Sequence, residues 1–324
     1  MVHDDEMSVI KHDERDVRSF VLVCLCRLIV KTLLSILPVS ERMLGRLAVL
    51  DEWAGRDRRT IPGVTAERSA IAGVPVDRIT PDLIDDPRTV VLYLHGGAFI
   101  ACGLNTHRAV ASTVARDLAV PLVNVEYRQC PQVGVGTSIR DAYAVYRALR
   151  ASADVDRIVV AGDSAGGYLA AKIVDYAARD GLAGPDAYIG FSPLLNLSPD
   201  AKRSSKHDAM LPVDRLEELR PFYERGPEPL DGSLDATADD VARHFPPVVL
   251  ICARDEALQK DALDLRDGLD RHGIPNEIHL YAGQIHAFPA AVSNSTQAKD
   301  AVRVATAFVR DALAEAGRAD AASA

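Results

Sequence analysis

One pentapeptide carries the strongest chemical signal in the sequence. Gly162-Asp163-Ser164-Ala165-Gly166 follows a short apolar run at 158–161 and precedes an apolar helical pattern. Glycines two residues before and after a serine are typical of a sharp turn from strand to helix, because bulkier side chains would collide there. Such a turn exposes the hydroxyl at the carboxyl end of the strand. Ser164 is therefore predicted to be a nucleophile, with the Ala165 amide pointing toward developing negative charge.

A glycine pair upstream of the serine has the character of an oxyanion loop. His95-Gly96-Gly97-Ala98 directly follows the apolar run 90–94. Amides of Gly96, Gly97 or Ala98 would join that of Ala165 in binding an alkoxide, and one such donor is worth about 3 to 4 kcal/mol. The alternative is a tight turn that needs small residues for its own geometry.

A serine nucleophile needs a base, and the chain has nine histidines. His286 is the best placed, because it follows the last predicted strand at 277–281 and comes last in the order serine, acid, histidine. His279 lies inside that strand and is expected to pack beside the sheet. His272 and His244 occupy ordinary positions, at a helix end and before a strand.

The acid that orients the imidazole is expected just past the carboxyl end of a strand, between serine and histidine in the chain. Asp255 follows the apolar run 248–253 and is the predicted acid. Glu256 and Asp261 compete with it. Asp261 falls near the start of the next helix, where an acidic residue is ordinary.

Strands and helices must alternate to bring these residues together. Apolar runs that predict strands stand at 90–94, 122–126, 158–161, 187–191, 248–253 and 277–281, and helical patterns stand at 107–118, 138–152, 166–179, 260–272 and 296–316. Most of the runs are continuous rather than alternating, as in strands covered on both faces. The pattern predicts an α/β fold with a mostly parallel central sheet flanked by helices.

The domain organisation follows from the two stretches outside this rhythm. The chain of 324 residues suits one large domain. Residues 1–60 are expected to form an N-terminal helical cap segment, and residues 61–324 the catalytic domain. Residues 198–242, charged and punctuated by prolines, are expected to be a cap insertion within it.

The composition of the chain argues against some classes of binding partner. A net charge of −9 without a basic block argues against nucleic acid. The five cysteines lack the paired spacing of zinc or redox sites and are expected to be buried thiols of a reducing compartment. No metal or organic cofactor is implied. A cytoplasmic location is expected, and a homodimer stays open as an alternative.

One apolar segment, residues 20–37, approaches the length that spans a bilayer. Arg27, Lys31 and Ser35 are four residues apart, so a helix here would carry one polar stripe on an apolar cylinder. A cap helix over an apolar pocket is the preferred interpretation. Peripheral attachment to a membrane surface is the alternative.

With these residues in hand, the chain resembles the hormone-sensitive lipase family of esterases and lipases over about residues 88–315. The resemblance is carried by HGGAF at 95–99, EYR at 126–128, GDSAGGYLAAKI at 162–173, SPLLNLS at 192–198, ARDEALQKDA at 253–262 and GQIHAF at 283–288. Two positions depart from the family pattern. Ala98 replaces a third glycine, and the acidic residue of the YRLAPE loop is missing at 129–132.

The resemblance implies an α/β-hydrolase fold with a helical cap, the triad Ser164, Asp255 and His286, and an oxyanion hole at Gly96, Gly97 and Ala165. It also implies a small-molecule or lipid ester of short- to medium-chain acid as substrate. An amidase or formamidase on the same triad is one alternative. A non-catalytic, membrane-associated scaffold that keeps the fold is another.

Overall fold

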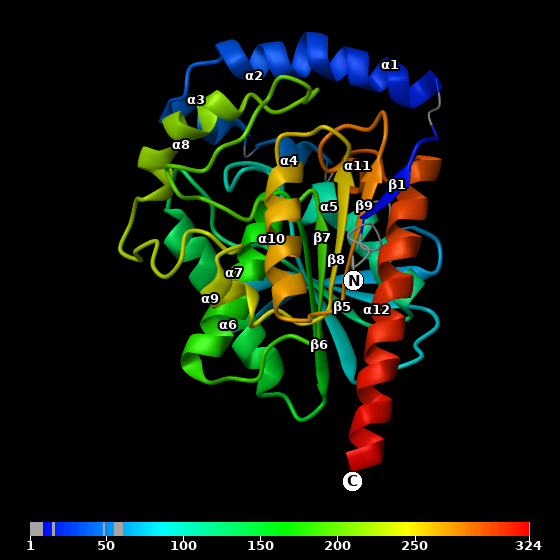
Figure 1. Cartoon of the computed structure of the whole chain (residues 1–324). Coiled ribbons are helices and arrows are strands. Elements are labelled where there is room, and N and C mark those ends of the chain that lie inside the picture. Colours follow the sequence, from blue (N-terminus) through cyan, green and yellow to red (C-terminus); the bar gives the residue numbers. More distant parts are fainter. Residues whose placement is uncertain (1–8, 15–16, 48, 55–60, 324) are drawn as a thin grey trace.

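The computed structural model describes residues 9–14, 17–47, 49–54 and 61–323 (Figure 1). A nine-stranded sheet forms its centre. In spatial order the strands are β1 (Val9–His12), β9 (Asn276–Tyr281), β8 (Val248–Ala253), β7 (Ala187–Phe191), β6 (Arg157–Asp163), β4 (Thr89–Leu94), β5 (Leu122–Val125), β3 (Val74–Pro81) and β2 (Val64–Ile71). Neighbours from β1 to β5 are parallel, and β3 and β2 complete the sheet in antiparallel pairing. The predicted mostly parallel α/β fold is confirmed.

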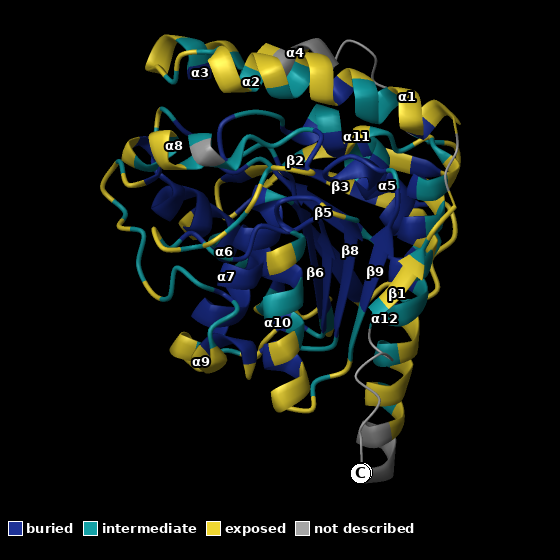
Figure 2. Ribbon diagram, turned by 45° about the horizontal axis from the view of Figure 1, so that its top comes forward, coloured by how far each residue is buried: buried dark blue, intermediate teal, exposed yellow. Residues whose placement is uncertain are grey.

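Helices cover both faces of the sheet. The bounds are α5 (Leu104–Leu118), α6 (Val135–Arg150), α7 (Ala165–Asp180), α10 (Gln259–Arg271), α11 (Phe288–Ala291) and α12 (Thr296–Ser323). Side chains of α6, α7 and α10 pack into one hydrophobic core, and those of α5 and α12 into the other. In β4, Leu92 and Leu94 face the first core while Val91 and Tyr93 face the second. Burial on both sides explains the continuous apolar runs (Figure 2).

The N-terminal part of the chain differs from the expected all-helical segment. Strand β1 lies beside β9 in parallel, with His12 opposite Tyr281, and their rings stack with centroids 4.0 Å apart. Residues 9–12 are thus part of the central sheet rather than of a cap. The hairpin of β2 and β3 also precedes the first predicted strand, and Ala72 and Gly73 turn it with positive φ angles of 51° and 80°.

Helices of two distant segments gather above the carboxyl ends of the parallel strands (Figure 1). The first segment contributes α1 (Val17–Leu25), η1 (Cys26–Lys31), α2 (Thr32–Ile36), α3 (Glu41–Leu47) and α4 (Val49–Ala54), and the second contributes η2 (Val213–Arg215) and α8 (Leu216–Tyr223). Helix α9 (Asp239–Ala242) lies instead beside the C-terminal end of α10, where Asp239 pairs with Arg271 at 3.2 Å (Figure 1). Arg225 forms an ion pair with Glu41 at 2.5 Å, and Arg215 donates to the Leu37 carbonyl at 2.6 Å. These bonds join the insertion to the N-terminal helices.

Candidate active site

The turn at Ser164 has the geometry that its glycines predict. Ser164 links β6 to α7 with φ 49° and ψ −121°, a sparsely populated backbone conformation. A Cβ atom on Gly162 would lie 2.5 Å from the Gly166 backbone, and one on Gly166 would lie 1.9 Å from the Leu94 carbonyl oxygen. Neither position has room for any side chain but hydrogen. The turn is therefore held by close backbone packing.

Neighbouring strands fix the backbone of Ser164 from the other side. Its amide donates to the Phe191 carbonyl at 3.1 Å, and its own carbonyl accepts from the amides of Gly167 at 3.0 Å and Leu194 at 2.9 Å. Ser164 is partly exposed, whereas the residues around it are buried. Hydrogen bonds to α7 and to the residues at the end of β7 thus hold the strained turn, and the serine side chain stays partly exposed.

The imidazole of His286 is bound to a carboxylate on one side. Its Nδ1 atom lies 2.8 Å from Oε2 of Glu256, and each side chain is 2% exposed. Burial of the ring lowers the pKa of His286, but the hydrogen bond and charge of Glu256 outweigh it, so the pKa lies above its ordinary value. Charges of Asp208 and Asp163 act in the same direction.

The other ring nitrogen of His286 is free within the described residues. Nε2 is buried and has no hydrogen-bond partner there. The bond between Ser164 and His286 is therefore not formed in this structure, although both residues lie at the same edge of the sheet. Serine–imidazole bonds are commonly long in apo enzymes and tighten in the Michaelis complex. The free nitrogen is the one that a nucleophile would use.

Asp255 does not occupy the place predicted for it. Its side chain is exposed, its amide donates to Oε1 of Gln259 at 2.6 Å, and its backbone has a positive φ of 69°. This turn directs Asp255 outward and brings the next residue, Glu256, to His286. Oε1 of Glu256 accepts from the Ala253 amide at 3.1 Å, which fixes the carboxylate at the end of β8. The expected pairing of Asp255 with His286 is wrong, and its competitor Glu256 makes the contact.

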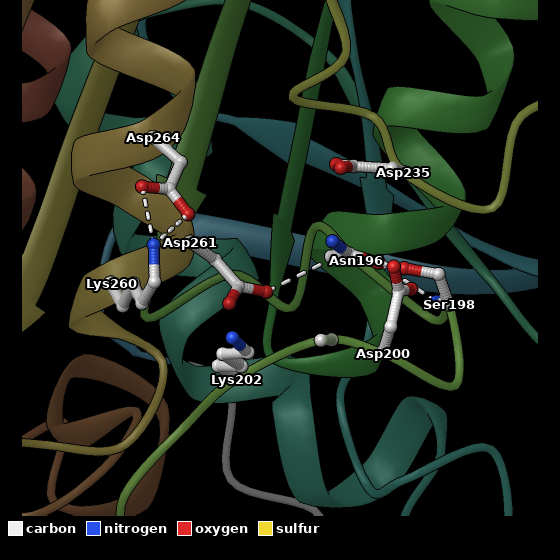
Figure 3. Close-up of a pocket in the computed structure, with 9 residues that line it drawn as sticks. Asn196, Ser198, Asp200, Lys202, Asp235, Lys260, Asp261 and Asp264 are labelled. Atoms are coloured by element: carbon white, nitrogen blue, oxygen red, sulfur yellow. Dashed lines mark hydrogen bonds and ion pairs between the residues drawn. The ribbon is translucent and has the colours of Figure 1, made fainter.

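The third competitor, Asp261, serves another cluster. It lines a polar pocket beside α10 (Figure 3). Its Oδ2 accepts from the amides of Leu195 at 2.9 Å and Asn196 at 3.1 Å, and Arg203 pairs with it at 2.6 Å. These bonds anchor the start of the insertion to α10. Asp261 is thus occupied away from His286.

The glycine loop after β4 offers fewer amides than expected. The Gly96 amide donates to Oδ1 of Asp163 at 3.0 Å and is turned into the protein. The expectation that Gly96 belongs to the oxyanion hole is therefore wrong. Within the described residues, the amides of Gly97, Ala98 and Ala165 donate to no other group. These three are available to a developing oxyanion.

The conformation of the loop requires glycine at 97. Gly97 has a φ of 113°, and a Cβ atom there would lie 1.9 Å from the Ala101 carbonyl oxygen. The Gly97 carbonyl accepts from the amides of Ile100 at 2.9 Å and Ala101 at 3.0 Å. Ala98 follows with a positive φ of 54°, which explains why the family pattern has glycine there.

A buried polar cluster supports the loop from behind, and sequence reasoning missed it. Asp163 accepts from the Tyr93 hydroxyl at 2.9 Å and pairs with Nε2 of His107 at 3.2 Å, besides binding the loop. Burial alone would raise the pKa of Asp163, but His107 and Tyr93 lower it below its ordinary value. The carboxylate therefore stays charged. Its place directly before the serine was the available signal.

His95, the histidine of the glycine loop, is held by hydrogen bonds and ring stacking. Nδ1 of His95 is bonded to the Gly96 carbonyl at 2.8 Å, and the His95 carbonyl accepts from the Tyr127 hydroxyl at 2.7 Å. The two rings stack with centroids 4.3 Å apart. Burial lowers the pKa of His95 to about 4, so the ring is neutral. His95 thus orients the loop. His279 is likewise buried away from the site, beside His12 at 3.0 Å.

The helix formed by α1, η1 and α2 uses its polar stripe to bind the protein. Arg27 donates to the His207 carbonyl at 2.8 Å, and Lys31 donates to the Asp208 carbonyl at 2.8 Å and to that of Ser205. Its apolar residues are exposed on the outside: Phe20 is 64%, Leu28 72% and Ile36 70% exposed. By length and composition this helix could also cross a membrane. The helix lies above the carboxyl ends of the parallel strands (Figure 1). Its role as a cap over an apolar pocket stays a prediction.

Comparisons with known proteins place the chain in a family. A family model described as alpha/beta hydrolase fold matches residues 91–290. The chain is 32% identical to Esterase LipU of Mycobacterium tuberculosis over 282 residues, which cover 82% of this chain and 92% of that protein. It is 32% identical to Carboxylesterase/phospholipase LipF of the same organism over 272 residues, 81% of this chain and 71% of that one.

Solved structures have the same fold. A crystal structure of EstE5 superposes with a TM-score of 0.79 at 21% identity, covering 93% of this chain and all (100%) of that one. An esterase from the bacterial hormone-sensitive lipase family superposes with a TM-score of 0.78 at 23% identity, covering 92% and 99%. The resemblance drawn from the motifs is confirmed. The chain belongs to the α/β-hydrolase family, among relatives that are esterases.

Proposed function

We propose that this protein hydrolyses carboxylic esters with Ser164 as nucleophile, His286 as base and Glu256 as the acid that orients it. The main support is the buried imidazole of His286. Its Nδ1 is bonded to the Glu256 carboxylate, and its Nε2 is free within the described residues, at the sheet edge where Ser164 lies. Relatives named esterase and carboxylesterase support the reaction class.

The reaction would proceed through an acyl-enzyme. Nε2 of His286 takes the proton as the Ser164 oxygen attacks the ester carbonyl, and the carbonyl electron pair moves onto oxygen. Amides of Gly97, Ala98 and Ala165 bind that oxyanion. Collapse expels the alcohol, which receives the proton from His286. Water then repeats the sequence on the acyl-enzyme and releases the acid and free Ser164.

Glu256 has two tasks in this proposal. It accepts a hydrogen bond from the Nδ1–H of His286 and so leaves Nε2 as the basic nitrogen, and its charge stabilises the imidazolium during each step. Glutamate reaches the ring because Oε1 is tied to the Ala253 amide at 3.1 Å. The carboxylate is thus fixed before substrate binds.

The proposed substrates are esters of short- to medium-chain acids. A relative named Ethyl acetate hydrolase, from Pseudomonas putida, is 29% identical over 63% of this chain and supports small esters. The test is a series of p-nitrophenyl acyl esters of increasing chain length, with an N-formyl aryl amine as the amide counterpart. We expect turnover of the short esters, none with Ser164→Ala, and far slower turnover of the amide. Preferential cleavage of the amide would overturn the ester assignment.

We further propose that the helix of α1, η1 and α2 attaches the protein peripherally to a lipid surface within the cytoplasm. Its exposed apolar side chains, Phe20, Leu28 and Ile36 among them, support this. Flotation with liposomes should carry the whole protein, and the double variant Phe20→Ser, Leu28→Ser should stay behind. Equal flotation of the two proteins would overturn this proposal. It would also be overturned if the protein were a homodimer that the same substitutions separate into monomers, because these side chains would then form the dimer interface.

A further inference from the structure

A buried carboxylate outside the proposed triad lies behind its acid. Asp208 is 1% exposed and belongs to the loop between β7 and η2. Its Oδ1 accepts from the amides of Met210 at 2.6 Å and Leu211 at 2.7 Å, which closes its own turn. These two bonds use only one of the two carboxylate oxygens of Asp208. The second oxygen makes a contact of another kind.

Oδ2 of Asp208 binds the loop that carries the acid. It accepts from the Ala257 amide at 2.8 Å, and Ala257 directly follows Glu256. The Ala257 amide lies in the turn in which Asp255, with its positive φ of 69°, points outward. The bond therefore fixes the segment in which Glu256, rather than Asp255, faces His286.

The charge of Asp208 also acts on the base. After burial and the effects of Glu256, the largest influence on the pKa of His286 is the charge of Asp208, which raises it, followed by that of Asp163. The carboxylates whose charge acts on His286 thus come from three elements: the turn after β8, the loop before η2 and the end of β6. Removal of any one charge favours the neutral imidazole.

The backbone of the same residue is held by the surface helix. The Asp208 carbonyl accepts from Lys31 at 2.8 Å, and Lys31 and Arg27 bind the neighbouring carbonyls of Ser205 and His207. A continuous chain of hydrogen bonds therefore runs from η1 through Asp208 to the turn of Glu256. This chain is a path along which the position of the helix can bias the site.

We infer that Asp208 is a positioning residue for the Glu256–His286 pair, and that Lys31 connects it to the surface helix. The inference rests on the proposed function. Displacement of the helix, for example on a lipid surface, would loosen the Asp208 turn and change the orientation of Glu256. The site would then respond to where the helix lies.

The first test is Asp208→Asn, which keeps the size of the side chain, removes its charge and leaves one acceptor oxygen in place of two. We expect kcat for a short soluble ester to fall about tenfold with KM little changed, and the acid limb of kcat/KM to move down by about 0.5 pH. Asp77→Asn is the matched control, because Asp77 is also 1% exposed and pairs with Arg108 at 2.8 Å far from His286. It should lower Tm and leave the limb in place. An unmoved limb in Asp208→Asn overturns the inference.

The second test addresses the connection to the helix. Lys31→Met keeps the length of the side chain and removes its hydrogen bonds, and Arg18→Met alters an exposed cation of the same helix. We expect kcat to fall at least about threefold with Lys31→Met and to stay unchanged with Arg18→Met. Equal kcat in both variants overturns the connection.

An NMR titration of the histidine rings keeps this inference separate from the proposed function. The His286 signal is assigned by its loss in His286→Gln. We expect its pKa to be lower in Asp208→Asn than in the wild type, whether or not either protein hydrolyses esters. An unchanged pKa contradicts the inference, whereas a lowered pKa in a protein without esterase activity contradicts the proposed function alone.

Discussion

Nδ1 of His286 and Oε2 of Glu256 lie 2.8 Å apart, and both side chains are sealed from solvent. Asp255, the preceding residue, points outward with a positive φ. Two adjacent carboxylates therefore have opposite environments. This difference makes their roles separable by single substitutions that change charge but not size.

The acid can be identified by comparing two amide variants. Glu256→Gln should lower kcat by about 10²- to 10⁴-fold, because the imidazolium formed in each step loses its carboxylate. Asp255→Asn should stay within about twofold of the wild type, as expected for an exposed surface residue. Steady-state hydrolysis of a p-nitrophenyl ester measures both. A reversed order would return the role to Asp255.

The pH profile should report the same pair. Activity needs neutral His286, so kcat/KM rises with pH through the pKa of this residue. Because Glu256 raises that pKa above its ordinary value of about 6.5, the wild-type limb should lie above pH 6.5. In Glu256→Gln the imidazolium has lost its partner, so the pKa of His286 should fall. The rise of the residual kcat/KM with pH should therefore occur at a lower pH than in the wild type. A limb that stays in place would exclude Glu256 as the cause.

Glycine substitutions test the oxyanion loop. Gly97→Ala should abolish measurable hydrolysis and lower Tm, because Gly97 has a φ of 113° and its Cβ would overlap the Ala101 carbonyl at 1.9 Å. Gly184→Ala is the control, since nothing lies within 4 Å of its Cβ. Thermal unfolding and hydrolysis of both variants give the comparison. A stable, active Gly97→Ala would refute the loop conformation.

A buried hydroxyl joins the loops of acid and base. Oγ of Ser192 accepts from the Ala287 amide at 3.0 Å, and the same hydroxyl acts to lower the pKa of Glu256. Ser192→Ala leaves the Ala287 amide without its acceptor at a cost of about 1 to 3 kcal/mol and should reduce kcat about tenfold. Ser138→Ala also removes a buried hydroxyl, bonded to the Arg128 carbonyl at 2.7 Å. It should lower stability with kcat unchanged, and an equal kcat in both variants would contradict the role of Ser192.

The fold was predictable where local sequence pattern and burial agree. Strands such as β4 and β8 are buried throughout and mostly apolar because both faces are covered, and the turn at Ser164 requires glycine at 162 and 166. Strand β1 was not predictable, since four residues with a mixed pattern gain their place from pairing with β9, which lies far along the chain.

The parts of the site that escaped prediction depend on tertiary contacts. Asp255 and Glu256 are adjacent at a strand end, and the positive φ of Asp255 turns Glu256 rather than Asp255 toward His286. The bond from the Ala257 amide to Asp208, from a distant loop, fixes this turn. The Gly96 amide has the right place in the loop, but Asp163 binds it from another strand. Residue types and spacing thus located the site, while the choice among neighbours required coordinates.

The central claim is that the Ser164 oxygen is a nucleophile activated within this site. The most direct measurement is labelling of the folded protein with a fluorophosphonate, followed by peptide mapping. We predict a single adduct on Ser164 that is lost in Ser164→Ala and strongly slowed in His286→Gln. No adduct on folded wild-type protein, or an adduct on another residue, would contradict the account.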